Sequence, residues 1–79
     1  MQMNPNSLTI RVSREEDERP LLRLAALDSK PAPSGPSLLA EVGNELWAAV
    51  SLRDGRTLAD PFRPSGEVLD LLRIRAATA

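Results

Sequence analysis

The chain contains no cysteine, no histidine and no tyrosine, and its only aromatic side chains are Trp47 and Phe62. Without cysteine there is no disulfide and no thiolate nucleophile, and without histidine there is no imidazole base. Zinc clusters depend on the same two residue types as ligands. We therefore expect no metal site, and any acid–base chemistry would have to use carboxylates.

Excess positive charge and long apolar runs are missing as well. The formal net charge is −1, whereas a general nucleic-acid binder carries a basic surface. No apolar run reaches the roughly 18 residues that a membrane span needs, and residues 1–7 lack the apolar core of a signal peptide. We expect a cytoplasmic protein that binds neither nucleic acid nor membrane. Arginine greatly outnumbers lysine, as in GC-rich genomes, which suggests a bacterial source.

The length of 79 residues allows one small domain, and the apolar fraction of 42% is that of a globular chain. Residues 1–7 are polar, so we expect them to be disordered and residues 8–79 to form the domain. Ordering each residue costs about 1.5 kcal/mol, and no disulfide or metal offsets this cost. Oligomerisation is a common remedy for so small a core.

The first half of the chain predicts a strand followed by a helix. Residues 8–12 alternate apolar and polar side chains with β-branched members, which is typical of a half-buried strand. Ser13 and Glu16 have the spacing of a capping box, and Pro20 should kink the helix or begin a second segment. The proline-rich residues 29–37 predict an irregular connection.

The second half predicts a three-stranded antiparallel meander and a final helix. Its strands, residues 38–42, 45–52 and 56–60, are joined by two-residue turns at Gly43-Asn44 and Asp54-Gly55. Strict alternation then places two apolar sets on opposite faces: Leu39, Leu46, Ala48, Val50, Leu52 and Ala59 on one, and Leu38, Ala40, Val42, Trp47, Ala49 and Leu58 on the other.

Because both faces are apolar, helices must cover both. The final helix is expected over residues 66–77, with Ser65 as its N-cap and with Trp47 buried beneath it. The fold class is therefore α/β (α+β): a small, mostly antiparallel sheet in the order β-α-(α)-β-β-β-α.

No catalytic constellation is visible in the sequence. Glu41 lies among apolar residues, but its place beside a turn favours an exposed rim position. Asp60 ends a strand, and the following proline favours an Asp-Pro turn. We therefore assign no catalytic residue.

One segment resembles a known binding motif. The run from Asp60 to Leu69 reads strand, turn, helix, and the amides of a helix N-terminus can bind anions. Pro61, Phe62, Arg63 and Gly66 resemble the pyrophosphate-binding turn of the GNAT superfamily of acetyl-CoA-dependent N-acetyltransferases. Arg63, Ser65 and Gly66 are then the candidate anion-binding residues, and acetyl-CoA is the cofactor that the resemblance implies.

The order of elements in residues 8–77 is also similar to the N-terminal half of a GNAT domain. Several residues depart from the motif: Val68 stands where the family has Gly or Ala, Pro64 removes an amide and Glu67 adds a negative charge. The tyrosine acid that often serves the family is absent. These departures favour a non-catalytic, GNAT-derived protein that associates with itself, as a homodimer, or with another protein.

Two alternatives remain open. One is an acetyl-CoA-dependent N-acyltransferase or CoA-binding protein that is completed by dimerisation. The other is an unrelated adaptor or antitoxin-like module. For the homodimer we expect contact through the final helix, including Leu72, and the neighbouring sheet face, and no strand addition at the last strand, which is short and ends in Pro61.

Overall fold

The computed structural model describes residues 7–78; the predicted disordered segment falls, apart from Ser7, outside this range, as does Ala79. The predicted α+β class and the order of elements are confirmed. The elements are β1 (Leu8–Val12), the short 3-10 turn η1 (Glu15–Asp17), α1 (Glu18–Leu27), β2 (Ser37–Val42), β3 (Glu45–Ser51), β4 (Thr57–Ala59) and α2 (Gly66–Ala77).

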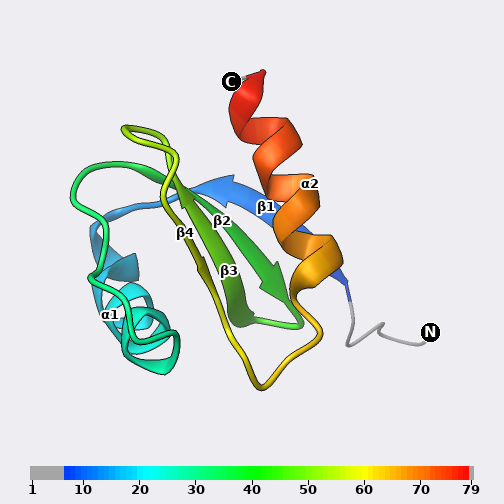
Figure 1. Ribbon diagram of the computed structural model, residues 1–79, viewed down its shortest axis with the longest axis horizontal. Helices are drawn as coiled ribbons and strands as arrows, with labels where there is room; N and C mark the ends of the chain where they lie inside the picture. Colours follow the sequence, from blue (N-terminus) through cyan, green and yellow to red (C-terminus); the bar gives the residue numbers. More distant parts are fainter. Residues whose placement is uncertain (1–6, 79) are drawn as a thin grey trace.

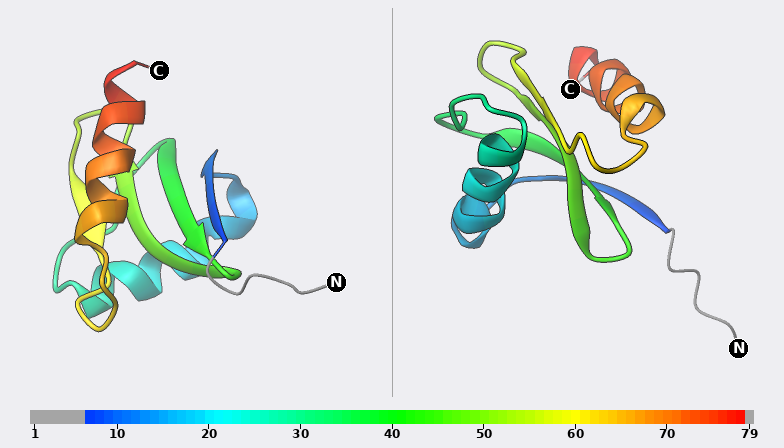
Figure 2. Two further views of the ribbon diagram at one scale, coloured as in Figure 1. Left: turned by 90° about the vertical axis from the view of Figure 1, so that its right-hand side faces the viewer. Right: turned by 60° about the horizontal axis from the view of Figure 1, so that its bottom comes forward.

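The four strands form one antiparallel sheet in the order β1-β2-β3-β4. Figure 1 shows α1 on one side of this sheet and α2 on the other. The prediction that helices cover both faces is therefore confirmed. The second view in Figure 2 looks along the sheet and separates these three layers. Among residues 7–78 there is no helix with the length and apolar character that crossing a bilayer requires.

The entry into α1 differs from the predicted capping box. The carboxylate of Asp17, and not that of Glu16, accepts a hydrogen bond from the Arg14 amide, at 2.7 Å. The Ser13 hydroxyl accepts one from the amide of Ser37 in the neighbouring strand, at 2.9 Å. The Ser13 hydroxyl is thus bonded to β2, and it does not cap the helix. The predicted break near Pro20 exists as the step from η1 to α1, with Pro20 in the first turn, where its missing N–H leaves no acceptor unpaired.

The two meander turns differ in kind. Gly43 and Asn44 have φ values of +57° and +72°, which confirms the predicted two-residue primed turn. The second turn is longer than predicted: Ser51 donates from its amide to the Arg56 carbonyl at 2.8 Å, so four residues, 52–55, form the loop. The Ser51 hydroxyl accepts from the amides of Arg53 and Asp54, and this side-chain cap stabilises the longer loop.

A β-bulge at Trp47 corrects the predicted faces of the sheet. Glu41 pairs with Leu46, but Ala40 pairs with Ala48, so Trp47 has no opposite residue on β2. One extra residue in β3 moves every following side chain to the other face. The longer β3–β4 loop sets the next pairing, in which Ala48 lies opposite Ala59.

The bulge produces two separate apolar clusters, one on each face. Beneath α1 lie Leu21, Leu24, Ala25, Leu39, Ala49 and Leu58, with Leu46 at the margin. Beneath α2 lie Leu38, Ala40, Ala48, Val50 and Leu72, with Ile10, Leu52, Val68, Leu69 and Ala76 at the margin.

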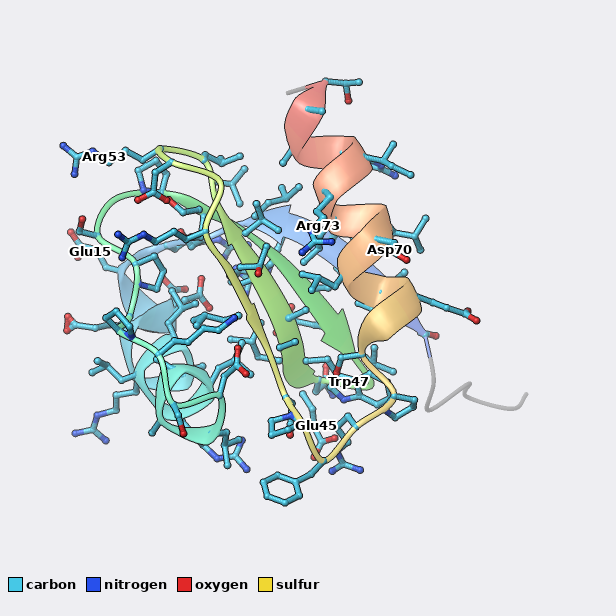
Figure 3. All side chains as sticks on the ribbon, viewed as in Figure 1. Glu15, Glu45, Trp47, Arg53, Asp70 and Arg73 are labelled. Atoms are coloured by element: carbon cyan, nitrogen blue, oxygen red, sulfur yellow. The ribbon has the colours of Figure 1, made fainter. Side chains whose placement is uncertain are left out.

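The burial of Leu72 and Trp47 differs from the prediction. Leu72 is fully buried against the sheet, so the expectation that it lies in an uncovered interface is wrong. Trp47 is only half-buried, so the expectation that α2 covers it is wrong as well. In the bulge, Trp47 lies at the end of the sheet next to the β4–α2 turn, where α2 begins, and not under the middle of the helix (Figure 3).

Candidate functional site

The β4–α2 turn, residues 60–66, holds all three predicted anion-binding residues. Asp60 is buried, and its carboxylate accepts a hydrogen bond from the Phe62 amide at 2.8 Å. This is the Asp-Pro turn that the sequence favours for Asp60. The carboxylate therefore serves the turn, which leaves Phe62 projecting into solvent.

Ser65 does not cap α2 with its side chain. It is buried, and its hydroxyl donates to the carbonyls of Asp60 and Arg63 at 3.1 and 3.3 Å. Its amide donates to the Arg63 carbonyl at 2.7 Å, and the Arg63 amide donates to the Asp60 carbonyl at 3.3 Å. These bonds tie the turn to itself. The predicted side-chain N-cap is thus wrong, because the hydroxyl acts as a donor within the turn.

Three amides at the start of α2 remain open. Within residues 7–78 no acceptor meets the amides of Gly66, Glu67 and Val68, as is usual in the first turn of a helix. A Cβ placed on Gly66 would meet nothing within 4 Å, so the space in front of it is open. A small anion could reach this position, with Glu67 as the opposing charge.

The third predicted residue, Arg63, points its charge at other groups of the protein. Its Nη2 donates to the Glu45 carboxylate at 2.9 Å, and its guanidinium lies over the Trp47 ring, 5.9 Å from the centroid. Glu45 also accepts a weak hydrogen bond, 3.4 Å long, from Trp47 Nε1. Figure 3 shows Glu45 and Trp47 side by side at this end of the sheet. The Arg63 guanidinium is therefore already paired with Glu45. An anion at the open amides of α2 would have to compete with Glu45 for this charge.

A second cluster of charges joins β1, η1 and β2. Arg11 donates to both oxygens of Asp17 at 2.8 Å and to Glu41 at 2.9 Å. The hydrogen bonds from Arg11 lower the pKa of Asp17 to about 2, against the opposing effect of burial. The same bonds, that to Asp17 first, raise the pKa of Arg11 further above its ordinary value. One cation thus joins the two carboxylates, and this arrangement ties β1, η1 and β2 together.

Glu41 is half-buried in this cluster, where the sequence favoured an exposed rim position. Its partner Arg11 could have been found, because both residues interrupt apolar strands that lie next to each other. Asp17 carried no such signal, since it lies in a run of acidic residues. No group of three His, Cys, Asp or Glu side chains in the described part of the chain is arranged to hold a metal ion.

A cavity of about 390 Å³ lies beside β4, under the proline-rich connection. Ala49 and Leu58 contribute apolar walls, and Lys30 and Arg56 lie at its margin. Each cation already has a carboxylate within ion-pair distance: Lys30 lies 3.4 Å from Asp28, and Arg56 lies 3.5 Å from Asp54. None of the predicted site residues lines this cavity, and it offers no free charge to a ligand.

Comparison with known proteins does not extend this picture: no family model, no curated protein and no solved structure matches the chain.

Proposed function

We propose that this protein is non-catalytic and acts by self-association, as a homodimer. The supporting observation is an apolar surface on the α2 side of the sheet. On β1, Leu8 and Val12 are 39% and 50% exposed, and on α2, Leu71 and Ile74 are 46% and 64% exposed. These four residues form what we call the β1–α2 surface.

The β1 residues of the β1–α2 surface lie on the side of the sheet that α2 covers. Leu8, Ile10 and Val12 alternate along β1, and Ile10 belongs to the cluster beneath α2, so all three side chains point to that side. In Figure 3, Arg73 lies on the near side of α2. Leu71 is about 200° from Arg73 around the helix, so it points to the far side, where β1 runs. Solvent contact of large apolar side chains on one side is typical of an interaction surface.

A second copy fits this surface better than a charged partner. The four side chains are aliphatic, so an identical surface related by a two-fold axis would complement them without requiring opposite charges. The two apolar clusters are small, and they lie on opposite faces of one thin sheet. Covering further apolar surface by association stabilises a core of this size.

The non-catalytic part of the proposal rests on the carboxylates. Asp17 and Glu41 are paired with Arg11, Glu45 is paired with Arg63, and Asp60 accepts an amide within its own turn. A general base has to be free to reach a substrate proton. The carboxylates that the fold brings together are already engaged by the protein.

The second candidate, an acetyl-CoA-dependent N-acyltransferase or a CoA binder, is favoured by the open amides at the start of α2. Titration calorimetry with acetyl-CoA tests it. We expect no binding with a micromolar Kd, since Arg63 is paired with Glu45. Micromolar binding that is lost in Arg63→Ala, and kept in the control Arg73→Ala, would favour this candidate over the non-catalytic one.

Light scattering coupled to size exclusion tests self-association. We expect a mass of twice 8.6 kDa at about 100 µM. Val12→Glu, on the β1–α2 surface, should return the mass to that of one chain. Leu22→Glu is the matched control, because Leu22 is 54% exposed on α1, on the opposite side of the sheet. If Leu22→Glu dissociates the protein and Val12→Glu does not, the surface is wrongly placed.

A further inference from the structure

The two edges of the sheet differ in how their outward backbone groups are satisfied. On β4, Thr57 and Ala59 point their amides and carbonyls away from β3, because the flanking pairs, Ser51 with Arg56 and Trp47 with Asp60, are the bonded ones. The Ala59 amide donates to Asp28 at 3.1 Å. The Thr57 carbonyl accepts a marginal hydrogen bond, 3.4 Å long, from Lys30 of the connection to β2.

These two side chains close the β4 edge against strand addition. Asp28 and Lys30 also form an ion pair with each other across this edge, at 3.4 Å. β4 is only three residues long and is soon followed by Pro61. Charged side chains and proline at an edge strand are the usual protection against pairing with another chain.

Within residues 7–78, no side chain from another element bonds to the outward backbone groups of β1. The Ser13 amide donates to Ser37, and the Gly43 amide donates to Ser7, so the odd-numbered residues of β1 are bonded to β2. Leu8, Ile10 and Val12 therefore direct their amides and carbonyls outward. The contact nearest to a cap is a marginal one, 3.4 Å from Arg11 Nη1 to the Val12 carbonyl. Figure 2 shows β1 at the outer margin of the sheet and not beneath α2.

The same three residues carry the apolar side chains of β1, so one strand offers both hydrogen bonds and apolar contact to an added strand. The single charge on β1, Arg11, is held on the opposite face by Asp17 and Glu41. β1 contains no proline, glycine or lysine. From these observations, and given the self-association proposed above, we infer that β1 pairs antiparallel with β1 of a second copy, which joins the two four-stranded sheets into one.

The register follows from the outward groups and from Arg11. A two-fold axis at Ile10 places Ile10 opposite Ile10 of the second copy and Leu8 opposite Val12 of the second copy. All outward amides and carbonyls of β1 then find partners, and Arg11 faces Thr9. A shift that centres the axis on Arg11 would place two arginines directly opposite, which is unfavourable, and a shift toward Thr9 would leave Val12 unpaired.

Charge variants at the facing pair test this register. In Leu8→Lys with Val12→Lys, like charges face each other, and we expect light scattering to show one chain where the wild type shows two. In Leu8→Glu with Val12→Lys, opposite charges face each other, and the dimer should persist. Contact between apolar faces without strand pairing predicts dissociation of both variants, so a monomeric Leu8→Glu, Val12→Lys protein overturns the pairing.

A disulfide gives a second, independent measurement, because the chain has no native cysteine. Paired residues at the axis have Cα atoms about 5.5 Å apart, so Ile10→Cys should form a linked dimer on mild oxidation. Val12→Cys is the matched control. Its two copies would lie about 14 Å apart along the strands, beyond disulfide reach, although Val12 is the more exposed residue.

The outcomes separate the two proposals. A wild-type protein that is monomeric at about 100 µM refutes self-association and the strand pairing together. A wild-type dimer that persists in Leu8→Lys with Val12→Lys leaves self-association in place and refutes the β1 edge. Faster linkage of Val12→Cys than of Ile10→Cys also refutes the Ile10-centred register.

Discussion

Replacing Asp17 by asparagine tests the charge cluster that joins β1, η1 and β2. The carboxylate accepts two hydrogen bonds from Arg11 at 2.8 Å and one from the Arg14 amide at 2.7 Å, and the residue is buried. Removing one partner of a buried pair costs about 3–5 kcal/mol when the other charge is left alone. Arg11 keeps Glu41 at 2.9 Å, so we expect a smaller loss.

The pKa of Asp17 gives a second route to the magnitude. The hydrogen bonds from Arg11, and then the one from the Arg14 amide, outweigh the opposing effect of burial and lower it from 3.8 to about 2; each pKa unit corresponds to about 1.4 kcal/mol. The ionised form therefore stabilises the fold by about 2 kcal/mol, the value we expect for Asp17→Asn at neutral pH. Because the folded-state pKa is the lower one, this contribution is complete above about pH 5 and is lost as the pH falls toward 2.

Urea denaturation of both proteins at several pH values measures this difference. We expect Asp17→Asn to be less stable by about 2 kcal/mol at neutral pH and the gap to narrow at about pH 2.5. Glu16→Gln is the matched control, since Glu16 is exposed and its ion pair with Arg14 is 3.7 Å long; it should cost less than about 1 kcal/mol. A gap that is unchanged between the two pH values would refute the reasoning.

Three further predictions concern packing, hydroxyl groups and glycines, each checked by denaturant unfolding. Leu72→Ala should cost about 2–5 kcal/mol, because Leu72 is the one fully buried side chain of α2 within the described residues. Ser37→Ala should be neutral or stabilising, since its buried hydroxyl has no hydrogen-bond partner among residues 7–78, whereas Ser65→Ala should cost about 1 kcal/mol through two lost bonds. Gly55→Ala should cost about 1 kcal/mol because its φ is +75°, and Gly66→Ala, with equally open space, should stabilise by up to about 1 kcal/mol.

Much of the fold follows from local signals. The turn at Gly43 and Asn44 is predictable because both positions need positive φ, and the sequence supplies the two residues that tolerate it best. The apolar character of both sheet faces requires two helices, and these are found on opposite sides. The first two pairs beyond that turn, Val42 with Glu45 and Glu41 with Leu46, follow from its length.

The remaining register could not be predicted in this way. The bulge at Trp47 depends on contacts from the other end of the chain, above all Arg63 over its ring and the Asp60 amide on its carbonyl. The alternation of apolar and polar residues along a strand does not predict such long-range contacts. The β3–β4 loop depends on a hydroxyl of Ser51 that caps two amides, whereas the Asp-Gly pair suggested a tighter turn.

The sequence predicted where the candidate site residues lie, but it did not predict which other residues they contact. The sequence indicated that Arg63, Ser65 and Gly66 lie at the start of the last helix, and the structure places them there. It could not show that Glu45, 18 residues earlier in the chain, reaches Arg63, because that contact depends on the end of β3 meeting the β4–α2 turn. Likewise Asp28 and Lys30, which close the β4 edge, give no local signal of this role.

Sedimentation velocity of the wild-type protein over a dilution series tests self-association most directly. At about 100 µM we expect one species with twice the 8.6 kDa chain mass, which dissociates on dilution toward the Kd and is unaffected by acetyl-CoA. A species of 8.6 kDa throughout the series would contradict the account, because the β1–α2 surface and the open β1 edge would then have no second copy to cover them.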